Sequence, residues 1–294
     1  MLDNQLGHDN ARVLALIGQY LNENPCAIGP EDMQEMMHTC QLRPEEAYAA
    51  LLCAWCGLDT SREKDVRIYR QYLPSMLHQL RAEDYAQDAY LQAVGFPEGA
   101  QGGIQLAAQQ YQPMELFVCD DFRVDHQGRV LPQLGWFPES FRYPALTEQG
   151  RVWMTITPNE INTLRPLARQ TKGQVLCYGL GLGYYAFHAS EQPQVVGITI
   201  VERSPEVIDL FQQMILPRFP HADKITIVEG DAFAYASEQA PRHRYDTVLC
   251  DLWHDAADGI PMYLRMKALE TPGPTYQYWI EPTMHYYIKE AALC

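Results

Sequence analysis

A short apolar run that leads straight into three alternating glycines constrains the fold of this chain most strongly. The run spans Val175 to Tyr178, and Gly179, Gly181 and Gly183 follow it. The apolar residues predict a short buried strand, and the residues after the last glycine predict a helix. Because glycine has no Cβ, the backbone of such a turn can bend sharply and approach a ligand closely. We therefore expect a strand, a turn and a helix that present backbone amide groups to a ligand.

The alternation of strand and helix continues after this turn. Further apolar runs begin at Val195, Ile225, Thr247 and Tyr276, and a helix is expected to begin at Pro205. Short apolar strands separated by helices are typical of a parallel sheet that is covered on both faces. The pattern predicts the α/β class, with a doubly wound, Rossmann-like and mostly parallel sheet. In such sheets, ligands bind beyond the carboxyl ends of the strands, where the strand order reverses.

Two other segments precede the expected sheet. Residues 1–98 predict a helical N-terminal domain, which includes helices over about 63–72 and 75–94. Residues 112–156 predict a small β-hairpin unit made of two successive hairpins, and residues 157–294 form the Rossmann-like domain. No pattern in the helical domain indicates chemistry. We interpret it as a cap, a substrate lid or a dimerisation surface. The last of these would make the protein a homodimer.

The expected Rossmann-like domain has characteristic features at both ends. Thr157, Pro158, Asn159 and Glu160 form the sequence of a capping box with proline at the first helical position. This predicts a helix that continues to about Gln170. No pattern for a closing antiparallel pair of strands follows the fifth apolar run.

Composition and charge narrow the classes of partner. The formal net charge is -15, and 47% of the residues are hydrophobic. Such a surface repels phosphate backbones, and no cluster of lysine and arginine offsets it, so we do not expect nucleic acid as a partner. A neutral or cationic small molecule suits this negatively charged surface better. No apolar run approaches the roughly 20 residues of a membrane span, and the amino terminus lacks the pattern of a secretory signal. We expect a cytoplasmic protein that does not bind membranes.

The eight cysteines give little indication of a metal or redox site. Cys53 and Cys56 form one Cys-x-x-Cys pair, but they lie in an apolar stretch that predicts a buried helix. No second pair stands at the spacing of a zinc site. We expect reduced cysteines in the core.

Acidic residues follow three of the predicted strands. Glu202 ends the second strand, 23 residues after Gly179, at a position where a carboxylate can accept hydrogen bonds from the ribose hydroxyls of an adenosine. Asp231 follows the third strand and could accept a hydrogen bond from an adenine amino group, while Ala232 or Phe233 covers the ring. Each has a simpler alternative, because Glu202 could pair with its neighbour or cap a turn, and Asp231 could cap a helix.

Asp251 follows the fourth strand and faces the same crevice in this arrangement. It could act as a general base or cap the next helix. His254 beside Asp255 could form a base with its orienting acid, although a surface histidine is the simpler interpretation. We weighed a divalent metal held by these three residues and Asp258, and we do not expect one, since such loops are usually only solvated.

Four features of the chain together resemble a known superfamily. They are the glycine turn, the acid after the second strand, Gly230-Asp231-Ala232, and the sequence Tyr-Asp-x-Val-x-x-Asp that ends at Asp251. They are similar to class I S-adenosylmethionine-dependent methyltransferases, and within these to the spermidine synthase-like group. The resemblance covers roughly residues 153–281.

The resemblance implies a methyltransferase that uses S-adenosylmethionine and acts on a small molecule. It implies that Asp251 borders the reacting centre as the catalytic residue. The cofactor-binding residues that it implies are Gly179, Gly181, Gly183, Glu202, Arg203, Asp231 and Ala232.

Departures from the family pattern keep other functions open. Many methyltransferases carry an acid where this chain has Cys177, and polyamine-forming enzymes carry a different glycine turn and a different sequence after the fourth strand. The last two departures count against aminopropyl transfer, which we keep as an alternative function. The segment from Gly181 to Ala186 also satisfies the dinucleotide pattern Gly-x-Gly-x-x-Ala. A catalytically inactive nucleotide-binding or assembly protein is a further alternative.

Aromatic residues surround the expected site. Tyr184 and Tyr185 follow the glycine turn and could shape a pocket. A second set lies at and after the fifth strand, and it could wall a substrate pocket or pack a last helix. This set comprises Tyr276, Tyr278, Trp279, Tyr286 and Tyr287.

Overall fold

The computed structural model describes residues 2–291, which divide into two compact units. The first unit contains Met1–Asp84 and Gln110–Arg142, and the second contains Tyr85–Gln109 and Tyr143–Cys294. The chain therefore leaves the first unit and returns to it before it builds most of the second. Each unit is described by itself below.

Helices make up most of the first unit. Two of them begin at prolines followed by acids, which favours a helix start because proline needs no amide hydrogen bond there and acids suit the positive end of the helix. A π-helical turn at Ile68–Tyr72 connects the fourth helix to the fifth. The helices are α1 (Leu2–Glu23), α2 (Pro30–Cys40), α3 (Pro44–Trp55), α4 (Glu63–Arg67) and α5 (Leu73–Met76), and α6 (Ala82–Ala86) leads into the second unit.

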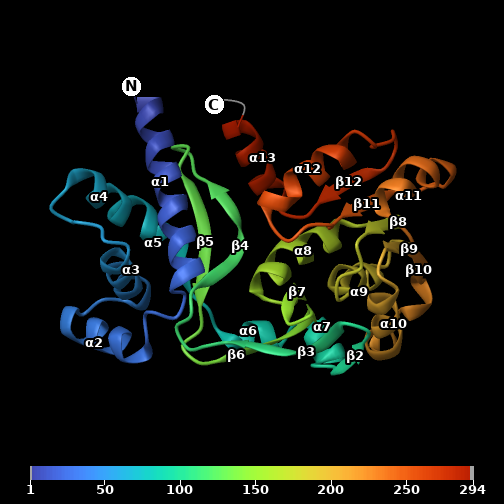
Figure 1. Cartoon of the computed structure of the whole chain (residues 1–294), viewed down its shortest axis with the longest axis horizontal. Helices are drawn as coiled ribbons and strands as arrows, with labels where there is room; N and C mark the ends of the chain where they lie inside the picture. Colours follow the sequence, from blue (N-terminus) through green and yellow to red (C-terminus); the bar gives the residue numbers. More distant parts are fainter. Residues whose placement is uncertain (1, 292–294) are drawn as a thin grey trace. The chain divides into compact units, whose positions relative to one another are not determined.

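A three-stranded sheet completes the first unit. β4 (Phe117–Val124) and β5 (Val130–Trp136) form an antiparallel hairpin with irregular register, and β1 (Leu77–Gln79) pairs parallel to β5. α1 lies along this hairpin (Figure 1), where Asn10 donates a hydrogen bond to the carbonyl oxygen of the turn glycine, Gly128, over 3.1 Å. The hairpin was predicted correctly from the sequence, and its parallel partner β1 was not.

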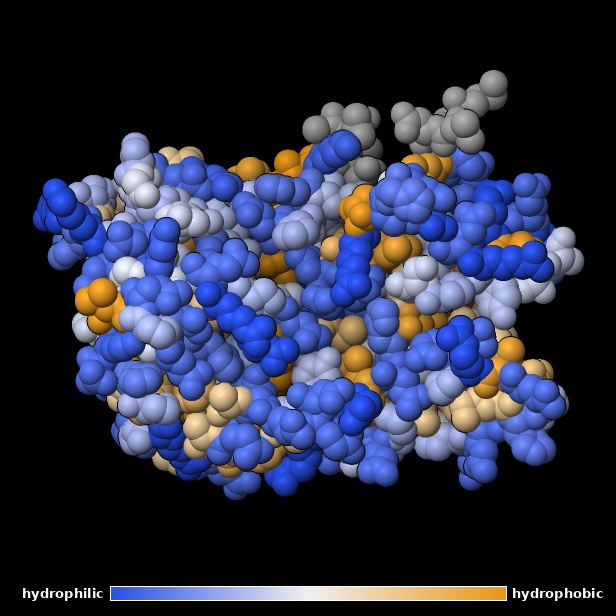
Figure 2. Space-filling view, turned by 180° about the vertical axis from the view of Figure 1, so that it is seen from behind, coloured by the Kyte–Doolittle hydropathy of each residue, from blue (hydrophilic) through white to orange (hydrophobic). Residues whose placement is uncertain are grey.

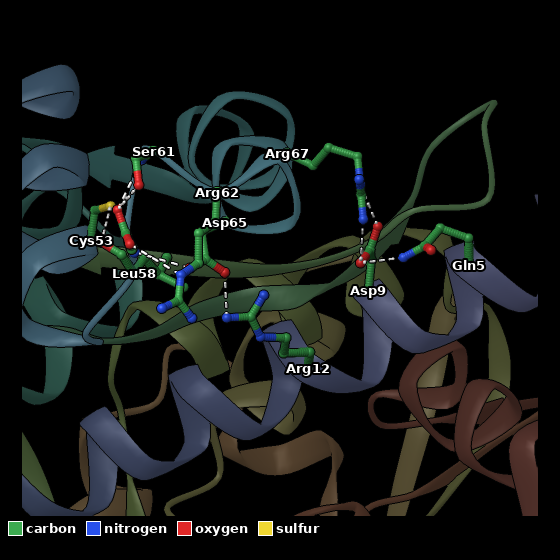
Figure 3. A network of polar contacts seen from close by, with 10 residues as sticks. Gln5, Asp9, Arg12, Cys53, Leu58, Ser61, Arg62, Asp65 and Arg67 are labelled. Atoms are coloured by element: carbon green, nitrogen blue, oxygen red, sulfur yellow. Dashed lines mark hydrogen bonds and ion pairs between the residues drawn. The ribbon is translucent and has the colours of Figure 1, made fainter.

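Two ion pairs tie α1 to α4 (Figure 3). Arg12 pairs with the buried Asp65 at 2.5 Å, and Arg67 Nε donates to the buried Asp9 over 3.0 Å. Burial alone would raise the pKa of Asp65, but a hydrogen bond from the backbone amide of Asp59 and the nearby Arg12 guanidinium hold it below its usual value. Asp65 is therefore ionised and paired at neutral pH.

The second unit contains a four-stranded sheet in the order β2-β3-β6-β7. The second predicted hairpin, β6 with β7, is present and antiparallel. It lies in a different sheet from the first hairpin, whereas the sequence indicated one antiparallel unit. The strands are β2 (Gly99–Gln101), β3 (Ile104–Tyr111), β6 (Phe141–Glu148) and β7 (Arg151–Thr155).

The prediction of one helix over about 75–94 is wrong. This stretch contains β1, α6 and the separate short helix α7 (Ala89–Val94), which begins at the N-cap Asp88. The Asp88 side chain accepts a hydrogen bond from the Tyr90 amide over 3.0 Å, so a local cap competes with a continuous helix.

A five-stranded, entirely parallel sheet forms the centre of the second unit (Figure 1). All five predicted strand positions are confirmed, and the strand order is β10-β9-β8-β11-β12. Because β8 lies in the middle and β9 and β11 flank it, the order reverses at β8. The strands are β8 (Gly173–Tyr178), β9 (Val195–Glu202), β10 (Ile225–Glu229), β11 (Thr247–Cys250) and β12 (Thr275–Tyr278).

Helices connect these strands, as the α/β class requires. The helix between β9 and β10 begins at Pro205, as predicted, and continues as a π-helical turn at Phe211–Ile215. Within the described residues β12 is an edge strand, and a helix follows it. The helices are α8 (Pro158–Gln170), α9 (Tyr184–Ser190), α10 (Pro205–Leu210), α11 (Ala232–Glu238), α12 (Ala256–Lys267) and α13 (Glu281–Ala291).

The surface is mainly polar on the face drawn in Figure 2, where apolar residues form small separate groups. Large apolar side chains that are more than half exposed include Trp55, Val124 and Val196. Among the described residues, none of the helices has both the length and the apolar character needed to cross a membrane.

Candidate functional site

A cavity of about 460 Å³ lies at the carboxyl ends of the parallel strands. The strand ends are level there, because Tyr178 pairs with Val201 on one side and with Cys250 on the other. The residues that follow β8, β9, β10 and β11 all contribute to the cavity wall, and β7 and the start of α8 add to it. The cavity is therefore located where strand order reverses, the usual ligand position in open α/β sheets.

The glycine turn forms one wall of this cavity. Gly179, Gly181 and Gly183 all have positive φ angles, of 94°, 55° and 76°. A Cβ at Gly179 would collide with the carbonyl oxygen of Asp251, and one at Gly183 would collide with the ring of Phe211. Only glycine suits these two positions, because both the backbone conformation and the space exclude a side chain.

Gly181 differs from the other two glycines. The nearest atom to a Cβ added there would be the sulfur of Met154 at 3.9 Å, and both residues line the cavity. The bare backbone at Gly181 is therefore open to the cavity and not packed against the protein.

Glu202 is buried, and its carboxylate holds the glycine turn in place. One oxygen accepts a hydrogen bond from the Leu180 amide over 3.1 Å, and the other accepts from the amides of Arg203 and Ser204 over 2.8 and 2.9 Å. Glu202 lines the cavity. The turn-capping alternative raised from the sequence is thus present, and the carboxylate also faces the space where a ligand would lie.

Arg203 is exposed and lies beside an aromatic ring. Its guanidinium carbon is 5.8 Å from the centre of the Trp153 ring, on β7. The His254 ring also meets the Trp153 ring edge-on, with 5.4 Å between the two ring centres. Among the described residues that line the cavity, Arg203 is the only arginine or lysine.

Asp231 and Ala232 follow β10 and also line the cavity. Asp231 caps α11, because its Oδ1 accepts a hydrogen bond from the Ala234 amide over 2.8 Å. The helix-cap alternative is therefore present, while Oδ2 remains available to a ligand. Phe233 lies next to them on the wall, with the guanidinium of Arg265 3.9 Å from its ring centre.

Asp251 and Glu160 are the two carboxylates of the cavity that lack an internal partner. Asp251 follows β11, Glu160 stands at the start of α8, and neither accepts a hydrogen bond from any other described residue. Enclosure by the protein raises the pKa of Asp251 from 3.8 to about 7. Enclosure, together with the negative charge of Asp251, also raises the pKa of Glu160 well above its usual value. A cationic group placed between them would relieve both effects.

Glu160 is a site residue that the sequence did not indicate. The capping-box prediction is wrong, because the Thr157 side chain makes no capping hydrogen bond, and the Glu160 side chain enters the cavity instead. The sequence signal that could have indicated Glu160 is its position at the start of the helix that precedes the glycine turn. The buried Cys177 lies on the same wall, and burial together with the charge of Asp251 raises the pKa of its thiol.

His254 is exposed, as the simpler interpretation of the sequence expected, and it does not pair with Asp255. His254 Nδ1 is 2.9 Å from Asp258, and Asp255 instead caps α12 by accepting hydrogen bonds from two amides of its first turn. This leaves His254 exposed at the cavity rim. Asp251 stays apart from this pair, and no group of three or more potential metal ligands occurs among the residues that the structure describes.

The aromatic residues have mixed roles. Tyr184 and Tyr185 line the cavity, but their hydroxyls bond away from it, to Asp88 over 2.8 Å and to Gln277 over 2.8 Å. Trp279 also lines the cavity, and its indole donates to Thr163 over 2.8 Å.

The remaining predicted aromatic residues do not line this cavity. The Tyr276 hydroxyl contacts Thr271, and Tyr278 donates to Glu270 over 2.9 Å. Tyr286 and Tyr287 are both on α13. Packing against other parts of the unit is therefore the main role of this set.

No protein-family model matches the chain, and a search of curated proteins finds no significant match.

Proposed function

We propose that this protein is an S-adenosylmethionine-dependent transferase with a doubly wound, Rossmann-like nucleotide domain, and specifically a methyltransferase that acts on a small molecule. The observation that carries the proposal is the convergence of Gly181, Glu202, Asp231 and Asp251 on one cavity. Four separate strand ends supply them, and the cavity lies at the strand-order reversal where nucleotides bind in such sheets.

The residues of the cavity suit such a ligand. The volume of about 460 Å³ falls within the range of small-molecule sites. The open backbone at Gly181 would be covered by a ligand, and the buried Trp253, also on the wall, has an indole nitrogen without a hydrogen-bond partner among the described residues. The two unpartnered carboxylates, Glu160 and Asp251, favour a ligand that carries positive charge, such as a sulfonium with an amino group.

We assign binding roles to the chain's own groups. The glycine turn supports the ligand with backbone, and Glu202 has acceptor capacity beyond its three amide hydrogen bonds for a ribose hydroxyl. The Oδ2 atom of Asp231 would accept from an adenine amino group, with Ala232 and Phe233 beside the ring.

The proposed reaction needs no covalent bond between the protein and the substrate. S-adenosylmethionine, when bound, supplies a methyl group on a sulfonium that a nucleophile can displace. The cavity walls exclude water and orient the acceptor. Where the acceptor must lose a proton, Asp251 would take it, because its carboxylate lines the cavity and has no hydrogen-bond partner among the described residues.

Aminopropyl transfer to an amine is the second candidate function. The unpartnered pair of Glu160 and Asp251 favours it, since two carboxylates in one cavity would hold an ammonium group. A dinucleotide ligand and a catalytically inactive binding protein have no comparable observation in their favour.

The unfolding temperature, measured with and without candidate ligands, tests the proposal. S-adenosylmethionine and S-adenosylhomocysteine at about 100 times their dissociation constants should stabilise the protein by about 2.7 kcal/mol. NAD should not, and Asp231→Asn should weaken the response. Preference for methylthioadenosine would favour aminopropyl transfer, and a response to NAD alone or to none of these ligands would overturn the proposal.

A further inference from the structure

The short helix α7 lies against the side of the glycine turn that faces away from the cavity. α7 belongs to the same compact unit as the parallel sheet and contacts α9 (Figure 1). The residues involved come from the segment in which the sequence indicated no function.

Tyr90 makes the first of two direct contacts with the turn. Its side chain is completely buried, and its hydroxyl donates a hydrogen bond of 2.6 Å to the carbonyl oxygen of Leu182. Leu182 lies between Gly181 and Gly183, so this hydrogen bond fixes the orientation of a peptide group in the centre of the turn. A buried carbonyl that lost this donor would be left unpaired.

Asp88 makes the second contact, with Tyr184, which is the residue after Gly183. Its Oδ2 accepts a hydrogen bond of 2.8 Å from the Tyr184 hydroxyl, and its Oδ1 is 3.3 Å from His188 Nε2. Burial alone would raise the pKa of Asp88, but the contacts with His188, Tyr184 and the Tyr90 amide hold it below its usual value. The buried carboxylate is therefore ionised and fixed by several donors, which makes it a rigid anchor.

Aromatic rings that pack with Tyr90 close the space beside Gly183. Phe211 occupies the space that a Cβ at Gly183 would need, and its ring packs edge-on against Phe219 at 5.6 Å. Phe219 in turn packs edge-on against Tyr90 at 6.3 Å. The glycine turn thus has one rigid side, made of α7 and these rings, and one open side that faces the cavity.

We infer that Asp88 and Tyr90 are positioning residues that set the conformation of the glycine turn and so prepare it for its ligand. The two contacts bracket Gly183, where the positive φ angle of 76° must be maintained for Leu182 and Tyr184 to line the cavity. The role as ligand support rests on the proposed function, whereas the effect on the turn itself does not. Neither residue touches the cavity, so neither is expected to take part in chemistry.

Two single-atom substitutions test the inference. Tyr90→Phe removes the hydrogen bond to Leu182, and Tyr184→Phe removes the one to Asp88, while both keep the aromatic ring. Tyr85→Phe is the matched control, because the Tyr85 hydroxyl accepts a hydrogen bond from Asn162 on α8. Amide hydrogen exchange of the ligand-free proteins is measured for the peptide over 180–184, with β10 as the internal reference.

Tyr90→Phe and Tyr184→Phe should each speed exchange over 180–184 about tenfold while β10 changes little, and Tyr85→Phe should leave the turn unchanged. Binding of S-adenosylhomocysteine should weaken about tenfold in the first two variants, equivalent to about 1.4 kcal/mol. Unchanged exchange in the turn, or an equal increase throughout the unit, would overturn the inference. If the wild-type protein fails to bind S-adenosylhomocysteine, the proposed function fails, while the exchange measurement still decides whether α7 positions the turn.

Discussion

The carboxyl group of Asp251 should make the ligand-free protein less stable as the pH rises from 4 to 7. Enclosure raises its pKa from 3.8 in the unfolded chain to about 7 in the folded protein, so the folded state binds a proton more tightly than the unfolded state does. This stabilising proton is fully bound at low pH and lost as the pH passes through 7. Glu160, whose pKa is also raised, contributes in the same direction.

The size of the effect follows from the two pKa values. At about 1.4 kcal/mol for each tenfold change in proton affinity, the rise from 3.8 to about 7 corresponds to at most about 4 kcal/mol. Because the Asp251 side chain keeps part of its surface exposed, about 2 kcal/mol is the more realistic expectation.

Urea unfolding at pH values from 4 to 8 measures this effect. Asp251→Asn mimics the protonated form, so it should stabilise the protein by about 2 kcal/mol at pH 8 and by progressively less as the pH falls towards 4. It should also reduce the remaining pH dependence, because Glu160 loses a neighbouring negative charge. Asp223→Asn, at an exposed position, is the control. Parallel stability curves for the wild type and Asp251→Asn would refute the reasoning.

Two other substitutions test the packing of each unit. Arg12→Met should cost about 3 kcal/mol in the free energy of unfolding, because it leaves the buried Asp65 without its cation; a loss below 0.5 kcal/mol in urea unfolding would contradict this. Gly179→Ala should lower both the unfolding temperature and the affinity for S-adenosylhomocysteine, because its Cβ collides with backbone. Gly150→Ala, which has a similar positive φ angle of 82° but no neighbour within 4 Å, should cost only about 1 kcal/mol and leave binding unchanged.

The parallel sheet could be predicted because its signals are local. Each strand is a short apolar run, and the glycines and acids that matter lie directly at the strand ends, at Gly179, Glu202, Asp231 and Asp251. Once the strands are parallel, their carboxyl ends meet at one edge of the sheet, so residues distant in sequence converge on one cavity. The enclosure of Glu202 and Asp251 follows from that convergence, whereas Asp231 stays exposed.

The remaining features depend on contacts that local patterns do not encode. The two hairpins were predictable from their turns, but their pairing with β1 and with β2 and β3 depends on segments read as helix or left unassigned. Asp88 and Tyr90 acquire a role only through contacts with residues more than 90 positions further along the chain. Glu160 matched a capping box, and whether its side chain caps the helix or enters the cavity is decided by tertiary packing.

A crystal structure with S-adenosylhomocysteine tests the proposed function most directly. It should show the adenosine in the cavity beyond β8 and β11, with its ribose at Glu202, its adenine at Asp231 and its amino-acid end towards Glu160 and Asp251. Density for the ligand outside this cavity, or a cavity closed by side chains in crystals grown with saturating ligand, would contradict the proposed function.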